Sequence, residues 1–362
     1  KIYYLCIILL YHLLKRNIQL FLDISQDIEK IIQKNILSKT FFKDKIILIT
    51  GGTGFFGKWL LNFFITLNSK YSANIKIFVI SRNPDQFLKD NNQDKFYDEI
   101  NFIKSDLKTV NLKGKKFDYC FHMATTNAKE TFQGESNLNK LDFLYASTNN
   151  LLTQLKYCNL EKILFTSSGV VYGPATEISN FNEESLSAPS MMHESSGLAE
   201  GKRLAEYLVS YYSKENKYKY SIARCFSFIG QHLPTDLHYA VGNFINDAKT
   251  KDEIIINGSG KDIRSYLYIG DAISWLISIF MNDNENSVFN VGSEKQISIY
   301  DLALLVKEIC KSNAKIVVLN KEASKDNFHR KIYAPDIKKI KNKLNIHEYT
   351  SLSEGIHKMI NS

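Results

Sequence analysis

The sequence has few cysteines, and none of them are spaced as metal ligands usually are. Cysteines occur at five of 362 positions, and no C-x-x-C pair is present among Cys6, Cys120, Cys158, Cys225 and Cys310. An odd number of widely spaced cysteines argues against a disulfide framework and against a zinc site. We therefore expect a reducing, cytoplasmic location and no bound metal.

Long apolar runs and blocks of basic residues are also missing. A membrane-spanning helix needs ~20 apolar residues, and the most apolar stretch, residues 2–14, is shorter and contains Tyr3, Tyr4, Tyr11 and His12. A signal-peptide remnant, an interfacial helix and a packed surface helix are open for this stretch, and we favour the last. The net charge is +8, without a run of five basic residues. We expect a solvated basic surface, no membrane span and no nucleic-acid partner.

What is present is the pattern of an α/β protein. Residues 45–50 are aliphatic and β-branched without alternation, which predicts a parallel strand buried on both faces. A glycine turn and an amphipathic segment over 58–67 complete a βα unit. The alternation continues with strands expected over 76–81, 101–104, 117–123, 162–166 and 220–225, and helices over 138–158 and 197–213. We predict a Rossmann-like, doubly wound parallel sheet.

The two ends of the chain differ from this core. Ile18, Leu22, Ile28, Ile31 and Ile32 have helical spacing and predict a helical extension. After the core, short strands over 252–256, 265–269 and 287–291 and a helix over 298–310 predict a smaller α+β lobe. We divide the chain into the extension (1–42), the Rossmann domain (43–230) and the lobe (231–362), from which some segments return to the Rossmann domain.

The turn that follows the first strand has the spacing G-x-x-G-x-x-G, with Gly51, Gly54 and Gly57. Such a turn brings backbone N–H groups and a helix N-terminus close to a pyrophosphate. Placed between a strand and a helix, TGGTGFFG resembles the cofactor loop of extended short-chain dehydrogenases, the NAD-dependent epimerase/dehydratase family. The resemblance implies an enzyme that binds NAD(P) and acts on a nucleotide-activated sugar. It implies cofactor contacts from Gly51, Thr53, Gly54, Phe55, Phe56 and Gly57.

Further segments match the family in order along the chain. Asp106-Leu107 resembles its adenine-binding pair, and Met123, Ala124 and Thr125 lie in a segment that begins at His122 and resembles its H-x-A-[AT] motif. The strand expected over 76–81 is followed by Arg82, and no acidic residue stands at its end. An acid there holds the ribose 2′-hydroxyl of NAD, whereas arginine suits the 2′-phosphate of NADP. The family favours NAD and Arg82 favours NADP, so the cofactor is predicted as NAD(P).

The catalytic segment departs from the family at one position. Ser168, in SSGVVYG, matches the family's Ser/Thr, and Lys202, in GLAEGKRLAE, matches the lysine of its Y-x-x-x-K helix. The tyrosine position is Leu198, and no tyrosine lies between Tyr172 and Tyr207. Three interpretations stay open: a cofactor-binding pseudoenzyme, an enzyme with another acid/base group, or an altered codon. His193, Glu194 and Glu200 are the candidate replacements.

A second departure concerns the reaction. In the family's dehydratases an Asp-Glu pair removes water, but this chain has Gly169 and Val170 at those positions. Neither side chain carries a proton, so the segment favours epimerisation or keto-reduction at C4 of the sugar. A 4,6-dehydratase with unusual acid/base residues is the alternative.

The resemblance also implies a substrate site and a dimer. Phosphate oxygens need fixed positive donors, and Arg264 is the first candidate, followed by Arg330 in HRKIYAPD. The segments around Arg264 and Asn243 resemble those of the family's diphosphate site. The helices expected over 138–158 and 197–213 carry apolar stripes, including Leu204, Leu208, Val209 and Tyr212. Family members often pair these helices as homodimers, and burial inside one subunit is the alternative.

Overall fold

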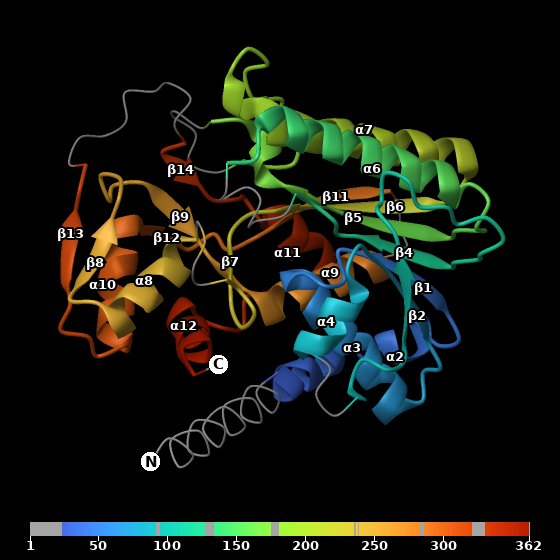
Figure 1. Cartoon of the computed structure of the whole chain (residues 1–362), viewed down its shortest axis with the longest axis horizontal. Coiled ribbons are helices and arrows are strands. Elements are labelled where there is room, and N and C mark those ends of the chain that lie inside the picture. Colours follow the sequence, from blue (N-terminus) through green and yellow to red (C-terminus); the bar gives the residue numbers. More distant parts are fainter. Residues whose placement is uncertain are drawn as a thin grey trace.

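The computed structural model describes residues 24–91, 95–126, 134–174, 181–234, 237, 239–282, 286–320 and 330–361. Its centre is a seven-stranded sheet in the order β11-β6-β5-β4-β1-β2-β3 (Figure 1). Every neighbouring pair in this sheet is parallel. The strands are β1 (Ile46–Thr50), β2 (Lys76–Ser81), β3 (Ile100–Lys104), β4 (Tyr119–His122), β5 (Lys162–Ser168), β6 (Lys219–Cys225) and β11 (Ser287–Val291). The Rossmann-like class expected from the sequence is confirmed.

Helices cover both faces of the sheet because its strands are apolar on both sides. α6 (Asn137–Leu155) and α7 (Gly197–Asn216) form the outer layer of one face (Figure 1). Gly201 of α7 permits their close approach, since a Cβ there would lie 2.8 Å from the Leu144 side chain. The other face packs against a helix over residues 24–34 and against α2 (Ser38–Phe41), α3 (Phe55–Tyr71), α4 (Pro84–Asn91), α9 (Ile269–Met281) and α11 (Lys338–Leu344).

The smaller lobe has its own apolar core and small sheets. Its helices are α8 (Ala240–Thr250), α10 (Ile299–Ile309) and α12 (Leu352–Ile360). Its strands are β7 (Phe228–Ile229), β8 (Glu253–Ile256), β9 (Ile263–Ser265), β10 (Leu267–Tyr268), β12 (Gln296–Ser298), β13 (Lys315–Val318) and β14 (Ile332–Tyr333). The division of the chain at residues 43 and 231 stays a prediction.

Two expectations for the C-terminal part were wrong. The segment 287–291 was expected in the lobe, but β11 is the outer strand of the central sheet and pairs with β6. The segment 265–269 was expected as one strand, but β9 ends at Ser265, β10 follows, and α9 begins at Ile269. α9 is buried nearly all round, so it lacks the one-sided apolar stripe by which amphipathic helices are recognised.

The N-terminal extension is tied to the lobe through Asp27. Its carboxylate accepts a hydrogen bond from the Tyr268 hydroxyl at 2.6 Å and pairs with the Lys358 ammonium at 2.7 Å. Burial, and then the nearby Asp27, raise the pKa of Tyr268, so its phenol keeps its proton and donates. Ile28, Ile31 and Ile32 are buried beside this contact, whereas Ile18, Leu22 and residues 2–14 lie outside the described residues. Within the described residues, no helix has the length and apolar content needed to cross a bilayer.

We expect Asp27→Ala to lower the free energy of unfolding by about 2 kcal/mol, because the variant leaves a buried phenol and an ammonium without their carboxylate. Chemical denaturation measures the loss. Lys30→Ala is the control, since Lys30 lies on the same helix, is largely exposed and only approaches Asp27 at 3.5 Å. A loss no larger than that of the control would show that the extension is not held by Asp27.

Candidate active site

The predicted cofactor residues gather where the parallel strands end. β1 and β4 are neighbours, and Gly51 follows β1 as Met123 follows β4. Gly51 has φ +72°, and a Cβ on it would lie 2.8 Å from the backbone nitrogen of Ala124. A Cβ on Gly57 would lie 2.3 Å from the Gly51 carbonyl oxygen. The turn therefore needs glycine at both positions, at the sheet edge where ligands bind in open α/β folds.

The start of α3 suits an anion. Gly54 is the N-cap residue in an extended conformation and has no side chain with which to cap the helix. The first turn begins with Phe55 and Phe56 and contains no acidic residue, so nothing there neutralises the positive end of the helix dipole. Thr53 lies in the same turn, partly buried. A turn that has room for glycine only, next to the N-terminus of α3, fits a dinucleotide's pyrophosphate.

The residues predicted for the adenine end follow β2 and β3. Arg82 is exposed directly after β2. Asp106 is partly buried after β3, and its carboxylate accepts a hydrogen bond from the Lys108 backbone at 2.8 Å. Leu107 is buried in the core between the sheet and α6 and α7. The structure thus places these residues at the same edge as the glycine turn.

His122 ties the strand ends together and is not an acid/base candidate. Its Nδ1 lies 2.7 Å from the Thr50 hydroxyl and its Nε2 lies 3.0 Å from the Thr148 hydroxyl. The Thr50 oxygen also accepts a hydrogen bond from the Ala124 backbone N–H at 3.1 Å. Burial lowers the pKa of His122 to about 3, and the nearby Lys202 contributes. The ring is therefore neutral, and the exposed Thr125 follows this fixed segment.

Ser168 ends β5, and Lys202 of α7 is bonded to the same strand. The buried Lys202 ammonium donates a hydrogen bond to the Thr166 carbonyl at 2.7 Å, two residues before Ser168. Burial lowers the pKa of Lys202 to about 8, although Cys225 and Glu206 raise it in part. Leu198 lies one turn before Lys202, partly exposed, where it offers no proton. Lys202 is therefore held against the strand that ends with Ser168, and position 198 supplies no tyrosine.

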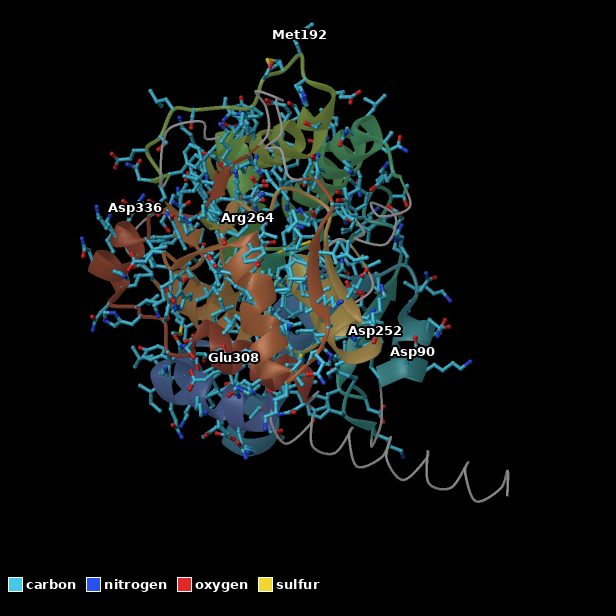
Figure 2. All side chains as sticks on the ribbon, turned by 90° about the vertical axis from the view of Figure 1, so that its left-hand side faces the viewer. Asp90, Met192, Asp252, Arg264, Glu308 and Asp336 are labelled. Carbon is cyan, nitrogen blue, oxygen red and sulfur yellow. The ribbon has the colours of Figure 1, made fainter. Side chains whose placement is uncertain are left out.

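Two of the three replacement candidates, His193 and Glu200, contact residues close to them in sequence. His193 caps a short 3-10 turn through its Nδ1, which lies 2.5 Å from the Ser195 hydroxyl. Glu194 is exposed, near the loop tip that Met192 marks in Figure 2. Glu200 faces Arg203 at 3.6 Å. None of these contacts involves Ser168 or Lys202, so the geometry gives no support to them as proton carriers.

The predicted diphosphate donors come from the lobe. Arg264 on β9 donates to the carbonyls of Ile263 and Lys331 and lies 3.5 Å from the Asp262 carboxylate. Figure 2 shows Arg264 near the middle of the lobe's face. Burial and the neighbouring Arg264 lower the pKa of Arg330, although Tyr333 raises it. Two guanidinium groups close enough to repel each other are suited to an anion between them. Asn243 lies partly buried in the first turn of α8.

Sequence reasoning missed two features of the site. Glu206 accepts hydrogen bonds from Ser167 at 2.5 Å and from both Nε and Nη2 of Arg224, which locks α7 to β5 and β6. Tyr333 on β14 brings its hydroxyl to 3.4 Å from that of Ser168. The segment HRKIYAPD drew attention for Arg330 alone, and no fixed spacing links Tyr333 to a serine 165 residues earlier.

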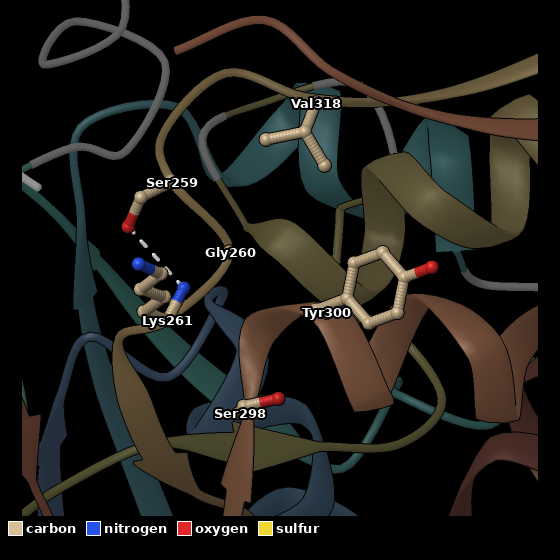
Figure 3. A pocket seen from close by; sticks show the side chains of 6 residues that line it. All are labelled: Ser259, Gly260, Lys261, Ser298, Tyr300 and Val318. Atoms are coloured by element: carbon tan, nitrogen blue, oxygen red, sulfur yellow. Dashed lines mark hydrogen bonds between the residues drawn. The ribbon is translucent and has the colours of Figure 1, made fainter. Parts of the chain in front are cut away.

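A separate hollow of about 570 Å³ lies on the lobe, between the loop before β9 and the start of α10 (Figure 3). None of the predicted site residues belongs to its lining, which consists of Ser259, Gly260, Lys261, Ser298, Tyr300 and Val318. The exposed Tyr300 ring projects there from α10. The hollow thus lies apart from the predicted catalytic groups.

Comparison with known proteins agrees with this geometry. Residues 47–292 match the model of the NAD dependent epimerase/dehydratase family. The chain belongs to this family. It is 27% identical over 319 residues to UDP-glucuronic acid decarboxylase 1 of Xenopus tropicalis, covering 87% of this chain and 71% of the relative. It is 30% identical over 272 residues to dTDP-D-glucose 4,6-dehydratase of Dictyostelium discoideum, covering 71% and 60%.

Solved structures share the fold of this epimerase/dehydratase family member. A mutant of UDP-glucuronic acid 4-epimerase from Bacillus cereus, in complex with UDP-4-deoxy-4-fluoro-glucuronic acid and NAD, superposes with a TM-score of 0.74. Its sequence is 24% identical, and the match covers 87% of this chain and 98% of that one. dTDP-glucose 4,6-dehydratase from Bacillus anthracis, in complex with NAD, gives a TM-score of 0.70 at 18% identity, covering 87% and 97%. The family match and the shared fold together confirm the expected enzyme family.

The structure gives a physical reason for the absence of a dehydratase acid at residue 169. A Cβ on Gly169 would lie 2.7 Å from the ring of Phe226, so that ring occupies the space of a side chain. Phe226 is itself packed against Tyr172 and Tyr333. An acid at this position would require the whole ring cluster to move.

We expect Gly169→Ala to lower the free energy of unfolding by roughly 1–3 kcal/mol, because overpacking a core forces side chains out of place. Gly258→Ala is the matched control, since a Cβ there meets nothing within 4 Å. Combining Gly169→Ala with Phe226→Leu should recover part of the loss in denaturant unfolding. Equal stabilities for the two alanine variants would contradict the overpacking.

Proposed function

We propose that this chain transfers a hydride and a proton at C4 of a nucleotide-activated sugar, as an epimerase or keto-sugar reductase. The observation that supports the proposal is that Lys202 bonds to β5, the strand that ends with Ser168, in the same parallel sheet in which the glycine turn follows β1. Arg264 and Arg330 come from the lobe. Hydride and proton movement at one carbon need these groups close together. When bound, the nicotinamide supplies the hydride chemistry.

Each residue has a defined task in this proposal. Ser168 holds the C4 oxygen by a hydrogen bond from the end of β5. Lys202, fixed by Thr166, faces the cofactor's ribose and contributes positive charge to the site. Arg264, Arg330 and Asn243 hold the diphosphate, because guanidinium and amide donors match phosphate oxygens. Water elimination is disfavoured, because Gly169 and Val170 carry no proton and the Phe226 ring fills the space beside Gly169.

The finer assignments draw on the relatives. UDP-glucuronic acid appears in the names of several similar proteins, which supports a UDP-activated sugar acid as the first substrate to try. NAD is the cofactor in the neighbouring complexes, whereas Arg82 after β2 supports NADP. We propose that NAD is bound for internal recycling and that Arg82 lets the 2′-phosphate of NADP be accepted as well.

The test is to titrate the purified chain with NAD and NADP and then to incubate it with UDP-glucuronic acid, UDP-glucose, dTDP-glucose, CDP-glucose and GDP-mannose. We expect a C4 epimer of unchanged mass, or reduction of a keto-sugar, by mass spectrometry and NMR. Loss of water would identify a 4,6-dehydratase, and loss of carbon dioxide a decarboxylase. Binding of cofactor and sugar without turnover would identify a pseudoenzyme and contradict the proposal.

A pair of glycine variants tests whether the cofactor binds at the glycine turn: one alters the turn and the other is its control. Gly51→Ala should abolish dinucleotide binding, because its Cβ would press into the backbone at Ala124. Gly114→Ala has a similar positive φ of +77° but meets nothing within 4 Å, so it carries the backbone strain alone. Retained dinucleotide affinity in a folded Gly51→Ala variant would refute this binding site.

We also propose a homodimer through α6 and α7. Val209 is buried inside the subunit, but Leu138 and Tyr145 of α6 and Leu204, Tyr207 and Tyr211 of α7 are exposed. Tyr207 is 63% exposed and Tyr211 50%, and their rings stack one helical turn apart with centroids 6.2 Å apart. Apolar side chains gathered on the outer layer of two helices support an interface with a second copy.

We expect Tyr207→Glu to convert the dimer into a monomer, because the charge would have to be buried in the interface. Size-exclusion chromatography with light scattering measures the mass. Leu319→Glu, at a 62% exposed position after β13, is the control and should leave the mass unchanged. A monomeric unchanged chain, or a dimer that persists in Tyr207→Glu, would contradict this interface.

A further inference from the structure

The catalytic segment has no tyrosine at position 198, but a phenol from the lobe lies next to Ser168. Leu198 occupies the position of the family's tyrosine, His193 bonds Ser195, and Glu200 faces Arg203. Tyr333, from the lobe, approaches Ser168 with an oxygen–oxygen distance of 3.4 Å. A sugar oxygen bound by Ser168 would therefore lie close to this hydroxyl.

Tyr333 is held in place by contacts with the lobe and with the Rossmann domain. On the lobe, it pairs in register with Arg264, through the contact of β14 with β9. On the Rossmann side, its ring lies 4.8 Å from that of Phe226, the residue that fills the space beside Gly169. The guanidinium of Arg330 lies 4.9 Å from the ring centre, and its Nε donates to the Gly173 carbonyl. The phenol is thus positioned by residues of the two predicted subsites.

The charge around Tyr333 suits a proton donor. Burial raises the pKa of Tyr333, while Arg330, Ser168 and Arg264 lower it in part. The phenol therefore carries its proton at neutral pH. The two arginines favour the phenolate that remains once the proton has been given away.

We propose that Tyr333 takes the place of the tyrosine absent at position 198 and exchanges a proton with the C4 oxygen of the sugar. Tyr333 gives its phenolic proton to O4 while C4 gains a hydride from the reduced cofactor, so the C4 carbonyl becomes CH–OH. In the other direction the phenolate takes the proton from O4 while C4 loses the hydride to the oxidised cofactor. This inference rests on the proposed function, because it assigns a group to the same reaction.

A double-mutant cycle tests the replacement. With UDP-glucuronic acid and NAD, Tyr333→Phe should lower kcat by about 100-fold, the usual scale for a lost acid/base group, with little change in KM. In a chain that already carries Leu198→Tyr, the same change should cost less than about 3-fold, since the second phenol would supply the proton. Tyr300→Phe removes the hydroxyl of an exposed residue that lines the separate hollow (Figure 3) and should leave kcat unchanged, because no predicted site residue lines that hollow.

A structural role for Tyr333 predicts a different result. Its loss would then cost the same in both backgrounds, and that outcome would overturn the inference. Undiminished kcat in Tyr333→Phe, with an active unchanged chain, would overturn it while leaving the proposed function standing. No turnover by the unchanged chain with any sugar of the panel would overturn both.

A measurement independent of turnover accompanies the cycle. The protein is labelled with tyrosine carrying 13C at Cζ, and the signals of Tyr333 and Tyr300 are assigned from the two phenylalanine variants. Addition of UDP-glucuronic acid with NAD should shift the Tyr333 signal and leave that of Tyr300 in place. A bound sugar nucleotide that leaves the Tyr333 signal unmoved would overturn the contact.

Discussion

The approach of Gly51 to the backbone that follows β4 is the contact on which the site depends. A Cβ at Gly51 would lie 2.8 Å from the Ala124 nitrogen, so the ends of β1 and β4 meet without an intervening side chain. Thr50 secures the junction by accepting from the Ala124 N–H and bonding the neutral His122. Because parallel strands share one carboxyl edge, this junction also fixes where β5 delivers Ser168.

Around that junction, two buried or largely buried cationic groups differ in their partners. Arg224 is bound bidentately by Glu206, and Ser167 donates to the same carboxylate, which joins α7 to two strands. Lys202, one turn earlier on α7, has only the Thr166 carbonyl as its hydrogen-bonding acceptor among the described residues, and burial lowers its pKa to about 8. The ion pair between Glu206 and Arg224 holds α7 against the sheet. Lys202 is therefore not needed to fix the helix and is suited to binding a ligand.

The sequence predicted those parts of the fold and the site best whose residues are close together along the chain. The glycine turn and strands β2 and β11 were predicted with their observed bounds or nearly so, because apolar runs and glycine spacing are local signals. The family resemblance supplied Ser168 and Lys202 as candidates, and the structure shows Lys202 bonded to the strand that ends with Ser168. α9 was missed because it is apolar all round, and the sheet position of β11 could not be read from five residues. Tyr333 was missed because only tertiary folding brings it to Ser168.

If the catalytic phenol belongs to β14 instead of α7, proton transfer depends on the position of the lobe. A tyrosine at position 198 would share a helix with Lys202 and would be in place whether or not the lobe held a substrate. Tyr333 instead shares a small sheet with Arg264, and Arg330 lies three residues before it. The arginines proposed to hold the diphosphate and the tyrosine proposed to carry the proton therefore contact one another within the lobe. In such an arrangement, any substitution that displaces β9 or β14 would weaken substrate binding and proton transfer together.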